Sequence, residues 1–433
     1  MNKKVDYEVK TSKFIFDSFI VWMFILCTLW TLRPFFSWST YMHGIFSGLS
    51  TPFFILGLVA YFLQLMICGV RFDNKTVILV ITTFIVSFLM IGVCGGFKFE
   101  KLLSGSWIPY MVIMTYLLLP NKLKKEIYNK LTLILAVMLI PSIIIYLFNL
   151  IGINLPYRTI EAFEDIKIIS GVFYKHYPFA VQTGSVHAVY DAAYALRLNG
   201  IFNEAGALGT ICALVLTAEK FDLKKWKNRI LFIAGVLSLS LAFFLITFLF
   251  YILDNLFERK FKNVLKLIMI VVAYFIFMNV PINAEPFTSI QSRLRFTTEG
   301  LAGDNRTSEA YNSLYEEFKN EGEVTRLFGK GDGAIAEEQN LRMIDGSSYK
   351  NIIFDFGYIG FGITITWTVL VSIVLMKQNR IPMKYTMIFC TIYLINMYQR
   401  PSVFYPGYLI IFLGGFYAFN NSGINYTKID NEV

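Results

Sequence analysis

The uncharged stretch FIAGVLSLSLAFFLITFLFYI, residues Phe232–Ile252, decides how the chain is threaded. A helix needs about 20 apolar residues to cross a bilayer, so the stretch is long enough for one crossing. A single crossing would place one of the two flanking basic loops outside, whereas basic loops normally stay in the cytoplasm. The cations of these loops are Lys220, Lys224, Lys225, Lys227 and Arg229 before the stretch and Arg259, Lys260 and Lys262 after it. We therefore predict that the chain turns back near Ser238–Ser240, as two short or tilted helices or as a re-entrant pair shielded by protein; one long tilted helix is the alternative.

The composition of the whole chain is that of an integral membrane protein. Of its 433 residues, 56% are hydrophobic, 17% aromatic and only 16% charged, and the mean hydropathy is +0.56. Further apolar runs are expected to be helices, because only a helix satisfies its own backbone in lipid. They lie at about 14–36, 44–70, 76–94, 102–119, 131–151, 200–218, 264–283, 351–376, 385–398 and 403–420. The predicted fold is one all-α membrane domain over residues 1–433, with about 12 transmembrane segments, or about 11 if 230–253 is one span.

Two features near these runs are interpreted conservatively. The first run leads to Trp30, Arg33 and Pro34 rather than to a small-residue cleavage site, so we expect an uncleaved span. The five cysteines lie in or beside apolar runs without CxxC spacing or clustered histidines. We interpret them as packing residues, and neither disulfides nor a metal site is expected.

The distribution of Lys and Arg predicts the orientation. The N-terminal tail and the loops 71–75, 120–130 and 219–229 are the basic ones, so these loops and both termini are predicted to be cytoplasmic. Two long polar loops, 152–199 and 284–350, then lie on the outer side. Long loops in a compact protein are usually functional, so we expect the chemistry there.

An outer site must use a substrate that arrives already activated, because ATP and sugar nucleotides are cytoplasmic. The sequence GKGDG, Gly329–Gly333, does not change this expectation, since it lacks the Lys-Ser/Thr pair of a phosphate-binding loop.

Both outer loops interleave aromatic and cationic side chains. Aromatic faces bind sugar rings, and guanidinium groups bind phosphate oxygens in pairs, so a sugar phosphate or pyrophosphate is the expected ligand. Any single one of these residues also fits an interfacial or solvated position. The candidate ligand contacts are Tyr174, His176, Tyr177, His187 and Arg197 in the first loop and Arg293, Arg295, Arg306, Lys330 and Tyr349 in or beside the second.

Residues 305–319 are predicted to form an amphipathic helix in the second loop. Tyr311, Leu314, Tyr315 and Phe318 recur at helical spacing, opposite three glutamates. We expect Asp304 or Asn305 to cap this helix, which places Arg306 in its first turn, where an arginine fork suits an anionic group.

The stretch RLNGIFNEAG, Arg197–Gly206, places two opposite charges where the first outer loop enters a span. Ionisable groups at membrane depth are costly, so Glu204, expected one turn inside a helix that starts at Ile201, is a functional candidate. Two helical turns separate the charges by roughly 10 Å, so we expect both to face one cavity rather than to pair. A charge pair at the interface is the alternative.

RLNGIFNEAGALGT resembles the Arg-x-x-Gly-Ile/Leu-Phe-x-Glu-Pro-Gly pattern of the Wzy-type O-antigen polymerases, within the O-antigen ligase and polymerase superfamily. DNRTSEA, RLFGKGDG and SSYKNIIFDFGYIGFG resemble the second outer loop of that family and the span after it. Ala205 stands where many relatives have Pro. The ligase branch has a His beside Asn where this chain has Ser348 and Tyr349, so the resemblance favours a polymerase.

The resemblance implies a GT-C-like, metal-independent glycosyltransferase of the bacterial inner membrane that polymerises O-antigen or capsule repeat units. The donor would be a glycan on undecaprenyl pyrophosphate and the acceptor the next lipid-linked repeat unit, with no cofactor and no nucleic acid. It also names a chain-length regulator and a flippase as candidate partners. A ligase shares the fold and donor; a transporter would be expected to show internal repeats and mid-span polar residues, and we see no convincing repeat and few such charges.

The candidate residues then take specific roles. Arg197 and Arg306 are expected to hold the pyrophosphate and stabilise its developing charge, with Arg293, Arg295 and Lys330 as further contacts. Glu204 is the favoured base for the acceptor hydroxyl, with His176 and His187 as alternatives. The residues expected to stack on sugars are Tyr174, Tyr177 and Tyr349.

Overall fold

The structure is a computed structural model, and it is mostly helical, with 74% of residues in helices. It describes residues 2–38, 48–68, 72–95, 97, 105–153, 155–162, 165–187, 196–258, 308–344, 346–398, 400–401 and 404–419, with separate positions between 265 and 301. Most of the predicted span 264–283 therefore lies outside the described residues.

Four helical stretches of the described chain are long and apolar enough to cross a membrane, which is consistent with a membrane protein. They are Ser50–Ile67, Asn74–Val93, Asn121–Leu150 and Lys350–Asn379. Shorter apolar helices cover Ile15–Thr31, Gly105–Leu118, Ala205–Ala218, Leu241–Phe257 and Pro406–Ala418. The prediction of a mainly helical protein is thus confirmed, and most of the predicted apolar runs are helices.

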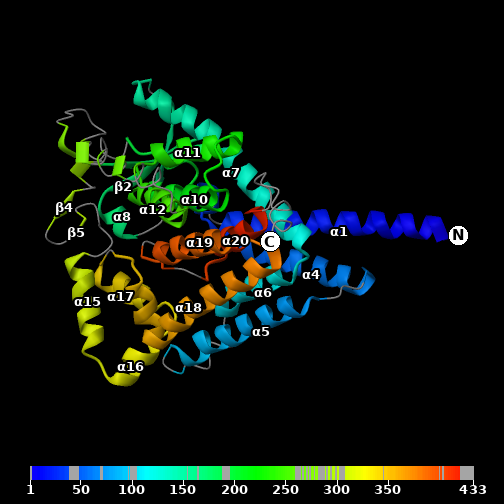
Figure 1. Ribbon diagram of the computed structural model, residues 1–433. Coiled ribbons are helices and arrows are strands. Elements are labelled where there is room, and N and C mark those ends of the chain that lie inside the picture. The colour runs from blue at the N-terminus through cyan, green and yellow to red at the C-terminus, as the bar shows by residue number, and fades with distance from the viewer. Residues whose placement is uncertain are drawn as a thin grey trace.

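The N-terminal part of the chain forms helices α1 to α7, and α1 extends away from the rest of the molecule (Figure 1). Their bounds are α1 Asn2–Thr31, α2 Phe35–Trp38, α4 Ser50–Cys68, α5 Asn74–Phe88 with a π-helical end Leu89–Val93, η3 Gly105–Trp107, α6 Ile108–Leu118 and α7 Asn121–Leu150. Helix α1 packs chiefly on α4, where Gly57 permits close approach because a Cβ there would lie 3.1 Å from Met23 Cβ.

The predicted return in the apolar stretch is confirmed. Helix α11 (Trp226–Leu237) ends at Ser238, and α12 (Leu241–Glu258) begins after Ser240; both pack on α10 (Ala205–Ala218). Leu198 N, ahead of α10, donates to Leu237 O at 3.0 Å, so α11 ends where α10 begins. Phe221, after α10, contacts the rings of Phe250 and Tyr251, so α12 ends where α10 ends. The chain therefore travels out and back.

The C-terminal helices are α18 (Lys350–Asn379), α19 (Met383–Asn396) and α20 (Pro406–Ala418). Helix α20 is buried along nearly its whole length, so it lies at the centre of the bundle. Cys27, Cys94, Cys212 and Cys390 are also buried, as expected of packing residues.

The first long loop, 152–199, contains a sheet, so the all-α prediction was incomplete. Its antiparallel strands are β1 (Arg158–Glu161), β2 (Val172–Tyr177) and β3 (Ala180–Ser185), in that order, with α8 (Asp165–Ile169) between the first two. The β-branched and aromatic residues of β2, which are Val172, Phe173, Tyr174 and Tyr177, favour a strand. Two short strands, β4 (Phe296–Thr297) and β5 (Gly300–Leu301), pair in the second loop.

The predicted amphipathic helix is α15 (Glu309–Lys319), and its four apolar residues are all buried. They form a second core with the start of α18, together with Ile335 of α17 (Ala334–Arg342). The cap differs from the prediction: Tyr311 N donates to Ser308 Oγ at 3.1 Å, so the helix begins later than expected. The Tyr311 hydroxyl contacts Ser348 Oγ at 3.1 Å, which makes Ser348 a packing contact of this core.

The GKGDG turn packs directly on α18, after the short helix α16 (Glu323–Phe328). Gly329 has φ +79°, and a Cβ there would lie 2.2 Å from Asp355 O. Gly357, with φ +70° inside α18, would place a Cβ 2.1 Å from Leu327 O. Both glycines are thus required where two backbones touch, which gives the RLFGKGDG and DFGYIGFG patterns a structural reason.

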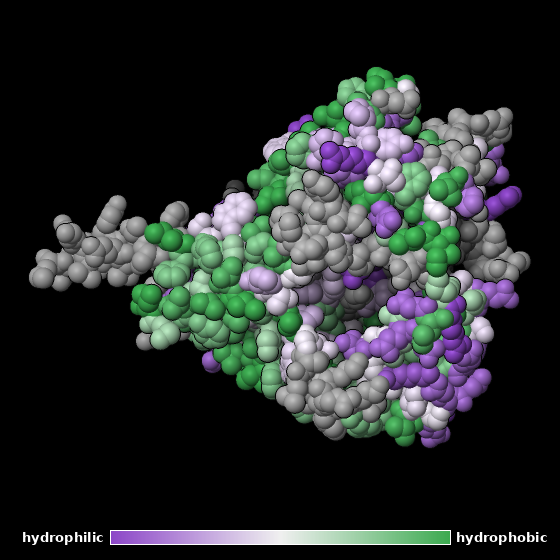
Figure 2. All heavy atoms as spheres, turned by 180° about the vertical axis from the view of Figure 1, so that it is seen from behind, coloured by the Kyte–Doolittle hydropathy of each residue, from purple (hydrophilic) through white to green (hydrophobic). Residues whose placement is uncertain are grey.

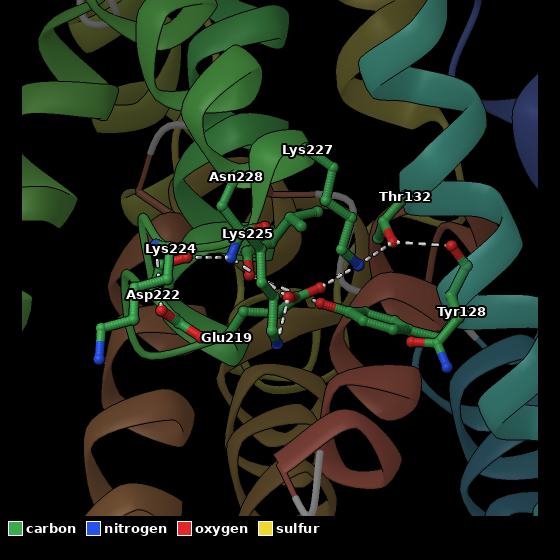
Figure 3. Close-up of polar contacts among 10 residues, drawn as sticks. Tyr128, Thr132, Glu219, Asp222, Lys224, Lys225, Lys227 and Asn228 are labelled. Atoms are coloured by element: carbon green, nitrogen blue, oxygen red, sulfur yellow. Dashed lines mark hydrogen bonds and ion pairs between the residues drawn. The ribbon is translucent and has the colours of Figure 1, made fainter. Parts of the chain in front are cut away.

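Two ends of the bundle differ in character. We call the end where α10 and α20 begin the loop end. There Val181 N of β3 donates to Gly200 O, and α15 packs on the start of α18. The opposite end, which holds the 219–229 loop and the end of α18, is the basic end. There the buried carboxylate of Glu219 binds Lys225 Nζ at 2.9 Å, Lys227 Nζ at 2.5 Å and Asn228 Nδ2 at 3.2 Å (Figure 3).

Candidate functional site

Glu204 lies at the loop end, directly ahead of α10. Helix α10 begins at Ala205, and Glu204 is its N-cap residue with extended backbone, φ −143° and ψ 138°. The expectation that a helix starts at Ile201 and encloses Glu204 was therefore wrong. The physical reason is that Ile201 O accepts a hydrogen bond from Phe35 N at 2.7 Å, and Phe202 forms a β-bridge with Pro34.

Two cations bind the Glu204 carboxylate. Arg400 Nη2 lies 2.7 Å from Glu204 Oε2, and Lys167 Nζ lies 3.3 Å from Oε1. These three side chains are 20–25% exposed, so the group borders solvent without being enclosed. Charge-assisted contacts of this kind are about twice as strong as neutral ones. Glu204 thus joins the first long loop to the short connection between α19 and α20, and the group carries one net positive charge.

Sequence reasoning missed Arg400 and Lys167. Arg400 lies 196 residues from Glu204 in sequence, and no periodicity connects them. The available signal was weak: a lone cation before Pro401, between two apolar runs.

A cavity of about 470 Å³, which we call the aromatic chamber, opens at the loop end, and Glu204, Arg400 and Lys167 are not part of its lining. Its walls come from the end of α1, α2, and the starts of α4, α6 and α20. Its aromatic lining residues are Trp30, Tyr405 and the buried Trp38, and Arg33 lies 5.9 Å from the centre of the Tyr405 ring. The Pro34–Phe202 bridge links this wall to the segment that carries Glu204.

A second cavity of about 380 Å³, the acidic chamber, lies on the other side of the start of α6. Gly105, Pro109 and Tyr405 line both chambers, so the two adjoin. Asp332 and Asp355 are the carboxylates of the acidic chamber. Figure 2 shows a hollow on one face of the molecule, between hydrophobic residues on the side of α1 and hydrophilic ones on the other.

Asp332 and Asp355 are held differently. Asp355 Oδ1 accepts from Ile335 N at 2.9 Å and its Oδ2 accepts from Gly333 N at 3.3 Å, so it fixes the start of α17. Asp332 is exposed and accepts from Ser106 Oγ at 3.2 Å. Asp332 is therefore the more accessible carboxylate of this chamber.

Arg197 lies near the end of α11 and not at the Glu204 carboxylate. Its Nε donates to Ser238 O at 3.4 Å. It lines a cavity of about 10 Å³ with Asn149 and Tyr177, and Glu204 is not part of that lining. Such a volume holds about one water molecule. Among the cavities lined by described residues, none has both Arg197 and Glu204 in its wall, and the expectation that they face one cavity stays a prediction.

The second-loop candidates are placed separately. Lys330 Nζ pairs with Glu321 and lies 4.9 Å from the Phe354 ring centre, so it packs within the loop. Arg295 is exposed. Tyr349 is half-buried, with its ring 6.1 Å from that of Tyr398, close in sequence to Arg400. Arg293 and Arg306 lie outside the described residues.

The first-loop aromatic candidates are mostly enclosed. Tyr174 is 1% exposed, packs on Trp38 and donates to Asn203 O at 2.8 Å. Tyr177 is 4% exposed, and its hydroxyl accepts from Asn149 Nδ2 at 3.0 Å. Neither ring offers a free face to a sugar in this structure, because strand packing buries both.

The two loop histidines differ in their surroundings. His176 packs against Phe35, and burial, together with Arg158, lowers its pKa from the ordinary 6.5. His187 is exposed near the end of β3. The described part of the chain has no group of three His, Cys, Asp or Glu side chains arranged to hold a metal ion.

No family model, curated protein or solved structure matches this chain.

Proposed function

We propose that this chain is a membrane glycosyltransferase that polymerises lipid-linked repeat units of a surface polysaccharide, on the outer face of a bacterial inner membrane. The observation that carries the proposal is the pair of adjoining chambers at the loop end, the same end of the bundle that holds a carboxylate bound by two cations. A polymerase must hold two glycans at once, and two chambers that share a wall provide such an arrangement. The sequence resemblance supports the same class.

The aromatic chamber suits a sugar of one substrate. Trp30, which is only partly buried, provides an aromatic face for a pyranose ring, and the exposed Arg33 adds a guanidinium group that can contact a phosphate oxygen. Tyr405, on the wall common to both chambers, lies where two sugars would meet.

The cations beside Glu204 suit the diphosphate. In the reaction an acceptor hydroxyl oxygen bonds to the anomeric carbon, and the bond from that carbon to the diphosphate oxygen breaks. Undecaprenyl pyrophosphate leaves with the bonding electrons, so its oxygen gains negative charge. Arg400 and Lys167 can stabilise that charge, and we add both to Arg197 and Arg306 as proposed diphosphate contacts.

The acceptor hydroxyl also loses a proton, which a carboxylate must take. Lys167 and Arg400 already stabilise the charge of Glu204. These contacts favour a role for Glu204 in positioning the two cations rather than in taking the proton. Asp332, the accessible carboxylate of the acidic chamber, is the second candidate base. The two assignments make different predictions for Asp332→Asn.

Purified protein in proteoliposomes, supplied with a synthetic lipid-linked repeat unit, tests the proposal. The parent is expected to build polymer, and Arg400→Ala to reduce its rate by about 100-fold or more, the usual effect of losing one charge-stabilising donor. Arg197→Ala and Arg306→Ala test the earlier assignments in parallel. Arg229→Ala, an exposed cation of the basic end, is the matched control and should leave the rate unchanged.

The outcomes separate the alternatives. Absence of polymer from the folded parent protein would refute the polymerase. In cells, loss of a polymerase leaves a single repeat unit on the acceptor, whereas loss of a ligase or a flippase leaves no glycan there. If Asp332→Asn retains full rate and Glu204→Gln does not, Glu204 remains the base candidate.

A further inference from the structure

A third cavity, of about 400 Å³, lies at the basic end, away from both chambers. It is enclosed by the starts of α5 and α7 and by the ends of α6 and α18. We call it the basic cavity. Its wall is largely polar, and its charged side chains are Asp73, Lys75, Lys377 and Arg380. Three cations therefore face one carboxylate.

The cations of the basic cavity are not neutralised within the described part of the chain. No ion pair to a described carboxylate is found for Lys75, Lys377 or Arg380, all of which are exposed. The lone carboxylate is occupied locally, because Gln378 Nε2 contacts both Asp73 Oδ2 at 3.5 Å and Thr76 Oγ1 at 3.3 Å. The cavity thus has an excess of two positive charges.

Two helix starts add to this positive potential. Helices α5 and α7 both begin at the cavity, and neither has a side-chain cap. The free N–H groups of a helix start favour an anion. The charge, the volume and the donors together suit a phosphate group.

The surroundings indicate what carries that phosphate. Phe72, Leu118 and Leu119 form the apolar part of the cavity wall. Directly beyond it, α5 exposes a row of large apolar side chains, with Ile78 59% and Ile81 54% exposed. A phosphate seated in the cavity would place attached acyl chains along this row, whereas a soluble phosphate would gain nothing from it.

We propose that the basic cavity binds the phosphate of an anionic glycerophospholipid in the membrane leaflet at the basic end. Lys377 and Arg380 at the end of α18 and Lys75 at the start of α5 hold the phosphate, and the apolar face of α5 holds the acyl chains. The site does not depend on the proposed glycan chemistry, since it lies at the other end of the bundle. Bound lipid would tie α18 to α5.

Native mass spectrometry of the full-length protein, with added phosphatidylglycerol or phosphatidylcholine, tests this site. The parent is expected to retain phosphatidylglycerol in preference to the zwitterionic lipid. Each cation near a membrane surface contributes about 1 kcal/mol, so Lys377→Gln with Arg380→Gln should weaken phosphatidylglycerol binding about tenfold or more. Lys224→Gln with Arg229→Gln removes the same charge from exposed positions at the same end and should leave binding unchanged.

Two results would overturn the proposal. Equal retention by the parent and the cavity variant would show that these cations hold no lipid. Displacement of phosphatidylglycerol by millimolar inorganic phosphate would show a site for soluble anions instead. Thermal unfolding of each variant identifies misfolding, and Lys377→Gln alone, at an exposed helix end, provides the test if the double variant unfolds.

Discussion

The contact between Glu204 and Arg400 can be measured by a double-mutant cycle. The variants are Glu204→Gln, Arg400→Gln and the two together, and glutamine keeps the shape while removing the charge. If the carboxylate organises the loop end, the two substitutions should not be additive. Their coupling energy then reports the strength of the pair directly.

The expected coupling follows from the geometry. Charge centres about 4 Å apart attract by about 4 kcal/mol at an effective dielectric constant of 20, which suits a site near the surface. Both side chains are partly exposed, 25% for Glu204 and 20% for Arg400, so solvent screening lowers the value. We expect a coupling of about 1–3 kcal/mol, between the values for exposed and buried pairs.

Lys167 makes the two single variants unequal. Glu204→Gln leaves Lys167 and Arg400 without their shared carboxylate, whereas Arg400→Gln leaves Glu204 still paired with Lys167 at 3.3 Å. The glutamate substitution should therefore destabilise the protein more.

Thermal and denaturant unfolding in one detergent, at low and high salt, provides the measurement. The exposed pair Arg342–Glu317, 2.8 Å apart, serves as the control, and its coupling should be smaller and lost in salt. A Glu204–Arg400 coupling no larger than that of the control would contradict the structural account of the site.

Three further predictions concern packing and pH. Gly209→Ala would place a Cβ 2.4 Å from Ser240 Cβ in the return between α11 and α12, so denaturant unfolding should show a loss of about 1–3 kcal/mol in the free energy of unfolding. The control Gly362→Ala, with no atom within 4 Å, should be neutral or slightly stabilising. Equal effects of the two substitutions would contradict the close packing at Gly209. Gly329→Ala forces a side chain onto φ +79° and against backbone, so folded yield and melting temperature should fall further than in Gly362→Ala. Because the folded-state pKa of His176 lies below 6.5, the unfolded chain binds more protons than the folded chain as pH falls through 6.5, and the stability of the protein should decline there. His176→Gln should flatten this decline, measured as melting temperature against pH. An unchanged pH profile in the variant would refute the assignment to His176.

The elements that followed from local patterns were predictable from the sequence. The return at Ser238–Ser240 followed from charge counting, because one crossing left a basic loop on the wrong side. The buried face of α15 followed from helical spacing of its aromatic residues. The cap at Ser308 was missed because Asp304, Asn305, Thr307 and Ser308 all suit that role. The β-branched and aromatic residues of Val172–Tyr177 were a readable strand signal, but they were interpreted only as a source of ligand contacts.

The candidate site was less predictable because long-range contacts position it. Helical periodicity extends the span that contains Glu204 back to Ile201, yet the backbone there bonds to Phe35 instead. That one competing contact moves Glu204 from helix interior to helix start, where its carboxylate reaches Arg400 from the far end of the chain. A pattern confined to one segment cannot reveal such a choice, since the free energy that decides it lies in residues far apart in sequence. The same contacts are therefore where the proposed chemistry is most open to test, because removing either partner changes the site while each helix stays intact.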